Sequence, residues 1–230
     1  MTISTFSTDT LAAVLCHAQV FNPRKCDTTM SQPDFNQLTV AVDRLFEALE
    51  SSRVPYLLVG GIAMLTYVEG RNTEDIDLIM RRDDLHDLEQ MVITDENQNF
   101  ARADYQGLQV DLLLTQNPLF EQVQQQYRSE IEWGKRRIPC ATPEGLVILK
   151  LYALPSLYGQ GKFDRAALYE TDVLQLAHNY NVQLEPAIKI IDPYVISSDR
   201  LEIRDIASDI ERRMQRMVRP RPSQSNDDSL

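Results

Sequence analysis

Two aspartates stand two residues apart in a segment that alternates charged and apolar residues. Asp75 and Asp77 alternate with Ile76 and Leu78, so residues 74–80 predict a β-strand. Successive side chains of a strand point to opposite faces, which puts both carboxylates on one face, about 7 Å apart. Adjacent carboxylates repel each other unless a cation lies between them. Carboxylate and phosphate oxygens are the ligands that Mg2+ prefers, so the pair predicts a divalent-metal site.

A third aspartate stands in an otherwise apolar run. Asp111 lies within residues 110–114, where a lone carboxylate is costly unless it is paired, hydrogen-bonded or metal-bound. Residues 100–105 and 108–115 predict a hairpin, which would bring Asp111 beside the first aspartate strand and to the same metal site. The alternative is that all three aspartates are solvated surface residues.

A glycine pair separates a predicted strand from a predicted helix. Gly60 and Gly61 follow the apolar residues 56–59 and precede a helix expected over 62–68. Glycine lets the backbone approach a ligand closely, and the free N–H groups at a helix start suit phosphate. Most glycine pairs are only tight turns, so the prediction of a phosphate site depends on the aspartate strand that follows.

Two basic residues are candidates for contact with that phosphate. Arg71 lies in the segment leading to the aspartate strand, where it can reach either carboxylates or phosphates, or it is an ordinary surface arginine. Lys150 lies in a helix that is apolar on nearly every side. A lysine there needs an anionic partner, phosphate or carboxylate, or it extends its ammonium group to solvent.

The elements that would position these residues predict an α+β fold. We expect a small mixed β-sheet with flanking helices over residues 34–140 and a helical C-terminal region over 141–218. Beyond the strands named above, the pattern predicts seven further segments: helices at 34–52, 83–92, 118–126, 142–154, 165–179 and 199–217, and a basic loop or ribbon at 133–137.

Both ends of the chain are expected to contribute little to the core. Residues 1–33 predict a loose arm, and the stretch that begins at Met30 resembles a natural start, so the first 29 residues could be an extension. Residues 219–230 contain too little apolar surface to fold and predict a disordered tail.

Composition limits the classes of protein. The net charge of −11 argues against a general nucleic-acid coat, although the clusters at 135–137 and 212–221 could guide RNA or form solvated faces. Three cysteines without metal-site spacing indicate a reduced, cytoplasmic protein rather than a disulfide scaffold or a zinc protein. No apolar run approaches the length of a membrane span, so we expect no membrane partner.

Three segments together resemble a known family. Val59-Gly60-Gly61, Asp75-Ile76-Asp77-Leu78 and Val110-Asp111 resemble the signature of the DNA polymerase beta-type nucleotidyltransferase superfamily. The run from Arg71 through Thr73 to Asp77 is similar to the bacterial minimal nucleotidyltransferases and the AbiEii-type toxins. The resemblance covers residues 56–115 well and extends loosely to about residue 180.

The resemblance implies a chemistry and a set of site residues. A nucleoside triphosphate, ATP or GTP, would donate its nucleotidyl group to a hydroxyl acceptor and release pyrophosphate. Two Mg2+ (or Mn2+) ions would bind to Asp75, Asp77 and Asp111, and the nucleotide would contact Gly60, Gly61, Arg71, Thr73 and Lys150. The acceptor stays open between an RNA 3′ end, a protein and a small molecule.

Two further expectations follow from the same resemblance. The protein could be a toxin with an antitoxin-like partner, or an inactive nucleotide-binding or interaction module with the same fold. One position departs from the pattern, because Leu168-Tyr169 stands where relatives often have Lys-Asp ahead of Asp172. Asp164-Arg165 and Lys162 stand nearby and could substitute for this pair.

Overall fold

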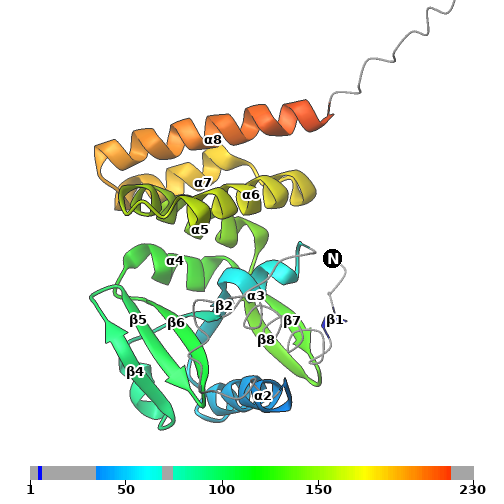
Figure 1. Ribbon diagram of the computed structural model, residues 1–230, viewed down its shortest axis with the longest axis vertical. Coiled ribbons are helices and arrows are strands. Elements are labelled where there is room, and N and C mark those ends of the chain that lie inside the picture. The colour runs from blue at the N-terminus through cyan, green and yellow to red at the C-terminus, as the bar shows by residue number, and fades with distance from the viewer. Residues whose placement is uncertain (1–4, 7–34, 69–74, 219–230) are drawn as a thin grey trace, which may run out of the picture.

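A mixed β-sheet forms one half of the molecule and a stack of helices forms the other (Figure 1). The computed structural model describes residues 5–6, 35–68 and 75–218. The strands are β1 (Thr5–Phe6), β2 (Tyr56–Val59), β3 (Ile76–Met80), β4 (Met91–Glu96), β5 (Phe100–Tyr105), β6 (Leu108–Leu114), β7 (Arg128–Trp133) and β8 (Arg136–Ala141). They form one sheet in the order β1-β7-β8-β2-β3-β6-β5-β4.

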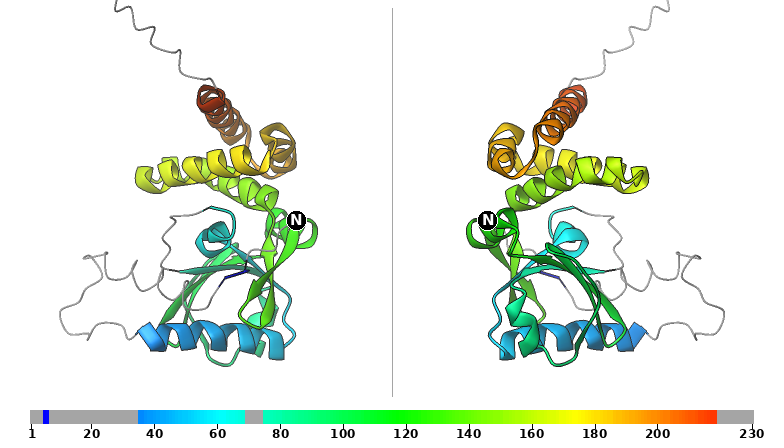
Figure 2. Two further views of the ribbon diagram at one scale, coloured as in Figure 1. Left: turned by 90° about the vertical axis from the view of Figure 1, so that its right-hand side faces the viewer. Right: turned by 90° about the vertical axis from the view of Figure 1, so that its left-hand side faces the viewer.

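The described helices cover both faces of this sheet. They are α2 (Phe35–Ser51), α3 (Gly60–Leu65), α4 (Pro118–Gln126), α5 (Pro143–Gly159), α6 (Phe163–Tyr180), α7 (Leu184–Ile191) and α8 (Ser197–Val218). Helix α2 lies on one face, and α3 and α4 lie on the other (Figures 1 and 2). Helices α5 to α8 stack beyond α3 and α4. The expected α+β fold with a helical C-terminal part is confirmed.

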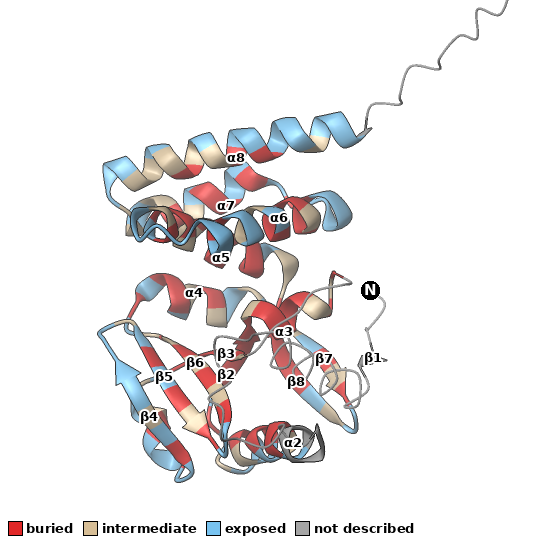
Figure 3. Ribbon diagram, viewed as in Figure 1, coloured by how far each residue is buried: buried red, intermediate tan, exposed pale blue. Residues whose placement is uncertain are grey.

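Helix α2 is held to the sheet by the apolar stripe that the sequence predicts. Val42, Leu45, Phe46 and Leu49 are all buried, as their helical spacing requires. The ring of Phe46 lies 5.1 Å from the ring of Trp133 on β7. The burial pattern in Figure 3 shows the same division, with buried residues where α2 meets the strands.

Helix α5 joins the two halves. Thr142 caps it, with its hydroxyl accepting a hydrogen bond from the Gly145 N–H at 3.3 Å. The helix packs most closely on α6 and also contacts α7 and α8. A second link lies at the end of α6, where the Tyr180 hydroxyl donates to the Tyr67 carbonyl at 3.0 Å. The helical half is therefore fixed to the sheet at separate points.

One expectation for the sheet is wrong. Residues 83–92 do not form a helix: a short 3-10 turn spans Asp83–Asp87, and the chain then enters β4. Leu85, Leu88 and Met91 are buried at a spacing that imitates a helical stripe, but Met91 pairs with Tyr105 of β5. Long-range pairing thus overrides the local pattern.

The segment after residue 126 is also more extended than expected. Strands β7 and β8 form an antiparallel hairpin that turns at Gly134, which has a φ of 58°. Ile131 and Trp133 are buried while their neighbours are more exposed, an alternation typical of a strand. The predicted basic loop or ribbon over 133–137 is the tip of this hairpin.

Two expectations for the helices need correction. Helix α5 continues past Pro155 to Gly159, because Leu154, Pro155 and Leu157 are buried and their packing offsets the lost backbone hydrogen bond. Helix α7 was not predicted, although it buries residues at helical spacing: Leu184, Ala187, Ile188 and Ile191.

Most of the two predicted end segments lies outside the described residues. Thr5 and Phe6 form β1, which pairs in parallel with Glu132 and Trp133 at the edge of the sheet. No helix within residues 35–68 or 75–218 is long and apolar enough to cross a membrane.

Candidate active site

Two of the predicted carboxylates lie side by side at the centre of the sheet. Strands β3 and β6 are parallel neighbours, and Asp77 is the register partner of Asp111. Residues paired in this way project from the same face. Asp75 precedes β3 by one residue, and the Gln109 amide nitrogen lies 3.4 Å from an oxygen of Asp75 and 3.4 Å from one of Asp111. The three aspartates form one carboxylate cluster.

Burial and like charge act together on Asp77. Desolvation, followed by the charges of Asp75 and Asp111, raises the pKa of the Asp77 carboxyl to about 7. The Gly61 N–H donates to Asp77 Oδ2 at 3.2 Å and acts in the opposite direction. The site thus holds more negative charge than its own backbone donors balance.

Gly60 makes this geometry possible. Its φ is +65°, and a Cβ placed there would lie 1.8 Å from Asp77 Oδ2. Any other residue would therefore force either the backbone or the carboxylate to move. The glycine pair lies directly against the central aspartate. In this structure the Gly61 N–H binds that carboxylate, and its predicted contact with phosphate stays a prediction.

Arg102, an arginine that sequence analysis did not single out, forms an ion pair with the third carboxylate, Asp111. Arg102 on β5 donates from Nε to Asp111 Oδ1 at 2.7 Å and from Nη2 to Oδ2 at 2.8 Å. This is a bidentate ion pair, in which both oxygens of the acid accept a hydrogen bond. The strand register alone could have revealed it, because Arg102 is the β5 partner of Asp111.

The carboxylate cluster fits a divalent cation in charge and in donor type. Its carboxylate oxygens are hard ligands of the kind that Mg2+ prefers. Within residues 35–68 and 75–218, however, no three acidic, histidine or cysteine side chains are arranged to hold a metal ion together. The Asp111 oxygens, which Arg102 holds, would have to change partner to join Asp75 and Asp77 around one.

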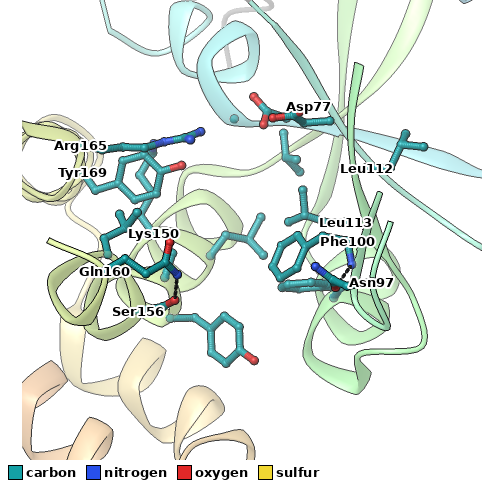
Figure 4. A pocket seen from close by; sticks show the side chains of 18 of the residues that line it. Asp77, Asn97, Phe100, Leu112, Leu113, Lys150, Ser156, Gln160, Arg165 and Tyr169 are labelled. Carbon is teal, nitrogen blue, oxygen red and sulfur yellow. Dashed lines mark hydrogen bonds between the residues drawn. The ribbon is translucent and has the colours of Figure 1, made fainter. Parts of the chain in front are cut away.

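The cluster faces a cavity of about 650 Å3 between the sheet and the C-terminal helices. Figure 4 shows Asp77 on one side and Lys150, Arg165 and Tyr169 on another, from α5 and α6. A third wall, which includes Phe100 and Leu113, comes from β5 and β6. The cavity thus brings together carboxylates, cations and an apolar surface.

Arg165 provides positive charge facing the carboxylates. Its guanidinium points towards Asp77 in Figure 4, and its carbon Cζ lies 5.8 Å from the centre of the Tyr169 ring. Tyr169, and then the charges of Asp77 and Asp75, raise the pKa of Arg165. Lys162 lines the same cavity. Arg165 and Lys162 are two of the three residues that the sequence offered in place of the missing Lys-Asp pair.

Lys150 has a carboxylate partner. Its Nζ lies 2.7 Å from Asp172 Oδ2, and the two side chains are 4% and 1% exposed. The Nζ also lies 4.1 Å from the centre of the Tyr169 ring. Extension to solvent is therefore wrong for this lysine, and the alternative of an anionic partner holds. Lys150 still lines the cavity, so its contact with a nucleotide stays a prediction.

Two predicted nucleotide contacts are not placed by this structure. Arg71 and Thr73 lie outside the described residues.

The basic clusters are largely paired with acidic side chains where they are described. Arg136 pairs with Glu50 at 2.8 Å, and Arg213 pairs with Glu170 at 3.2 Å. Those ion pairs favour the interpretation of solvated faces over an RNA path.

Comparison with known proteins gives a likeness at the level of structure. No family model and no curated sequence matches the chain. The solution structure of the antibiotic-resistance factor ANT(2'')-Ia aligns at 14% identity over 77% of this chain and 96% of its own, with a TM-score of 0.50. Its crystal structure with adenylyl-2''-tobramycin aligns at 13% identity over 72% and 96%, also with a TM-score of 0.50.

A third solved structure also aligns with the chain. It is an antigenic nucleotidyltransferase-like protein from Paracoccidioides brasiliensis, with 16% identity over 75% of this chain and 93% of its own and a TM-score of 0.48. Identities of this size concern the fold and not the activity. The chain has the fold of a nucleotidyltransferase core followed by a helical C-terminal part.

Proposed function

We propose that this protein is a metal-dependent nucleotidyltransferase, which moves a nucleoside monophosphate from a nucleoside triphosphate to a hydroxyl acceptor. One observation carries the proposal. Asp77 and Asp111 lie side by side on β3 and β6, with Asp75 joined to them through Gln109, and they face a cavity that Arg165 also lines. Carboxylates that would bind a metal and a cation that would bind phosphate therefore line the same cavity.

The carboxylate cluster would hold Mg2+ or Mn2+, two ions by the family resemblance. Such ions, when bound, neutralise the triphosphate and lower the pKa of the acceptor hydroxyl. In the transfer, the acceptor oxygen forms a bond to the α-phosphorus while the bond to pyrophosphate breaks. Asp111, which lines the cavity, is our candidate to receive the hydroxyl proton.

The basic residues would act on the leaving group. Arg165 faces the carboxylates across the cavity (Figure 4), and Lys162 lines the same cavity. Both can neutralise charge that develops on pyrophosphate. Gly60, Gly61, Arg71, Thr73 and Lys150 remain proposed nucleotide contacts. Of these, Gly60 and Lys150 line the cavity.

For the acceptor we favour a small hydroxyl-bearing molecule that is neutral or positively charged. Two acidic residues outside the carboxylate cluster also line the cavity, Asp95 and Asp199, as does Glu96, which pairs with Arg82. An RNA 3′ end would bring phosphates into this acidic surface, on a protein whose net charge is already −11. The comparison with ANT(2'')-Ia, crystallised with an adenylylated tobramycin, agrees with an acceptor of this size.

The proposal is tested by incubating the protein with each α-labelled nucleoside triphosphate, Mg2+ and one of three acceptor pools. The pools are RNA, protein and small molecules from a cell extract. We expect pyrophosphate release that depends on Mg2+ and label in the small-molecule pool. Asp77→Asn is the matched negative control. Equal label with the variant protein would refute the assignment of the site.

Two finer possibilities can be separated by the same variant. A toxin of the toxin–antitoxin type rests on the resemblance of residues 71–77 alone, and it predicts that the wild type stops host growth while Asp77→Asn does not. An inactive binding module is favoured by the Arg102 pair on Asp111, which competes with metal. That alternative predicts nucleotide binding without pyrophosphate release in any acceptor pool.

A further inference from the structure

Arg102 lies between two acids on neighbouring strands. Its register partner on β6 is Asp111, and its register partner on β4 is Asp95. All three residues line the cavity. Because directly opposed residues project from the same face, they form a row across β6, β5 and β4. The guanidinium occupies the Asp111 end of that row and leaves a second carboxylate on its other side.

The two side chains of the Arg102–Asp111 ion pair differ in their exposure to solvent. The Asp111 side chain is 16% exposed, while the Arg102 side chain is 48% exposed. A half-exposed guanidinium can leave its partner and stay hydrated, so separation does not strand a buried positive charge. Asp111, in contrast, needs a replacement cation if Arg102 leaves.

The carboxylate cluster is the place where a replacement cation would bind. Asp111 shares the cluster with Asp77 and Asp75, and both of its oxygens accept hydrogen bonds from Arg102. Metal and guanidinium therefore compete for the same two oxygens. An arginine stays protonated in proteins, so the guanidinium competes as a cation.

We propose that Arg102 is a displaceable counter-ion, which holds Asp111 in the metal-free protein and moves towards Asp95 when a divalent ion binds. This inference rests on the proposed function, since it assumes that the carboxylate cluster binds metal. Arg102 is thus a positioning residue that sets how tightly the site takes its ion. The register of β4 against β5 shifts at a β-bulge between Ile93 and Asp95, next to the carboxylate that would receive the arginine.

The test measures the affinity of the full-length protein for Mn2+, by paramagnetic resonance of the free ion, with and without a non-hydrolysable nucleoside triphosphate. Arg102→Gln removes the competitor, and we expect Mn2+ to bind about three- to tenfold more tightly. Arg137→Gln is the matched control, because it makes the same charge change at a side chain that is 73% exposed and away from the cavity. Equal tightening in both variants would overturn the proposal.

Asp95→Asn tests the second position of the arginine. Without Asp95, the displaced guanidinium has no carboxylate to receive it, so Mn2+ binding should weaken. The double variant Asp95→Asn, Arg102→Gln should bind Mn2+ as Arg102→Gln does. An equal effect of Asp95→Asn in both backgrounds would mean that Asp95 acts only through its charge, which would overturn the two-position mechanism.

Failure of this inference can be told from failure of the proposed function. If the wild type binds Mn2+, Asp77→Asn does not, and Arg102→Gln matches the wild type, only the role of Arg102 is refuted. If neither the wild type nor Arg102→Gln binds Mn2+ with or without nucleotide, the metal site itself is refuted along with it. The melting temperature of Arg102→Gln, whose side chain is half exposed, serves to verify that the variant is folded.

Discussion

The molecule contains two acidic sites that treat charge in opposite ways. Asp172 is buried against Lys150 at 2.7 Å, one acid with one base and almost no exposure. In the carboxylate cluster, Asp75, Asp77 and Asp111 lie together, and the pKa of Asp77 rises to about 7. The first site pairs its carboxylate with a buried cation, whereas the second brings three carboxylates together, and it is there that we propose a cation binds.

The largest effect on turnover should come from a change in the carboxylate cluster. Asp77→Asn removes a proposed metal ligand while keeping a side-chain oxygen that can accept from the Gly61 N–H. We expect turnover to fall by about a thousandfold or more, since several kcal/mol of charge stabilisation are lost. Stability should stay equal or rise, because a desolvated carboxylate is removed.

Pyrophosphate release and the melting temperature check this prediction. Asp209→Asn is the control, an aspartate on α8 that is 68% exposed and pairs with Arg212. Unchanged turnover in Asp77→Asn would remove the distinction between the two acidic sites.

A change in the buried Lys150–Asp172 pair should instead lower the stability of the fold. Lys150→Met leaves the Asp172 carboxylate buried without its cation, and we expect a loss of about 3–5 kcal/mol in the free energy of unfolding. Lys189→Met is the control, because this lysine is 70% exposed and pairs with Glu185 at 3.8 Å. Denaturant titration measures both.

A double variant sharpens this second prediction. Replacing both partners, as in Lys150→Met with Asp172→Leu, should restore most of the stability, since buried ion pairs contribute little over apolar groups of similar size. If the double variant regains stability but loses nucleotide affinity, Lys150 also contacts the nucleotide. If the single variant is as stable as the wild type, the two sites do not differ as stated.

A smaller effect is expected for the base that faces the carboxylate cluster. Arg165→Gln should lower nucleotide affinity by about tenfold, the equivalent of one charge-assisted contact of about 1.5 kcal/mol. Its side chain is exposed, so the melting temperature should hardly change. Isothermal titration with a non-hydrolysable nucleotide measures the affinity, and Arg137→Gln provides the control for net charge.

The chain ends should matter least. Deleting residues 1–29 and 219–230 should leave the melting temperature within a few degrees, since their composition offers little apolar surface. The deletion removes β1, whose pairing to Glu132 and Trp133 involves two residues only. A large fall in the melting temperature would show that the N-terminal segment packs on the core, and thermal denaturation decides the matter.

The sequence predicted local features better than contacts between distant segments. The alternation around Asp77 and the apolar stripe of α2 are properties of neighbouring residues, and both elements are present. Strand β4 escaped prediction because Met91 stands at a helical spacing from Leu88, while its pairing with Tyr105 is decided by the rest of the sheet. The period of a short segment does not reveal such a partner.

The candidate site shows the same limit. Asp77 and Asp111 could be proposed as neighbours, because each is an acid in an apolar strand. The ion pair of Arg102 with Asp111 needs the register of β5 against β6, which no single segment contains. The partner of Lys150 was considered as one of several anions, and only the packing of α5 on α6 distinguishes Asp172 from a bound phosphate.

The cap at Thr142 has a consequence for how this protein could diversify. On one side of it the chain supplies the carboxylate cluster and the apolar wall, and on the other it supplies Lys150, Lys162 and Arg165. Neither stretch encloses the cavity alone. Changes in the helices after Thr142 can therefore alter the shape of the cavity while the strands that hold the acids stay constant. Under the proposed function, chimaeras joined at this residue that keep Lys150, Lys162 and Arg165 would change the acceptor and retain nucleotidyl transfer.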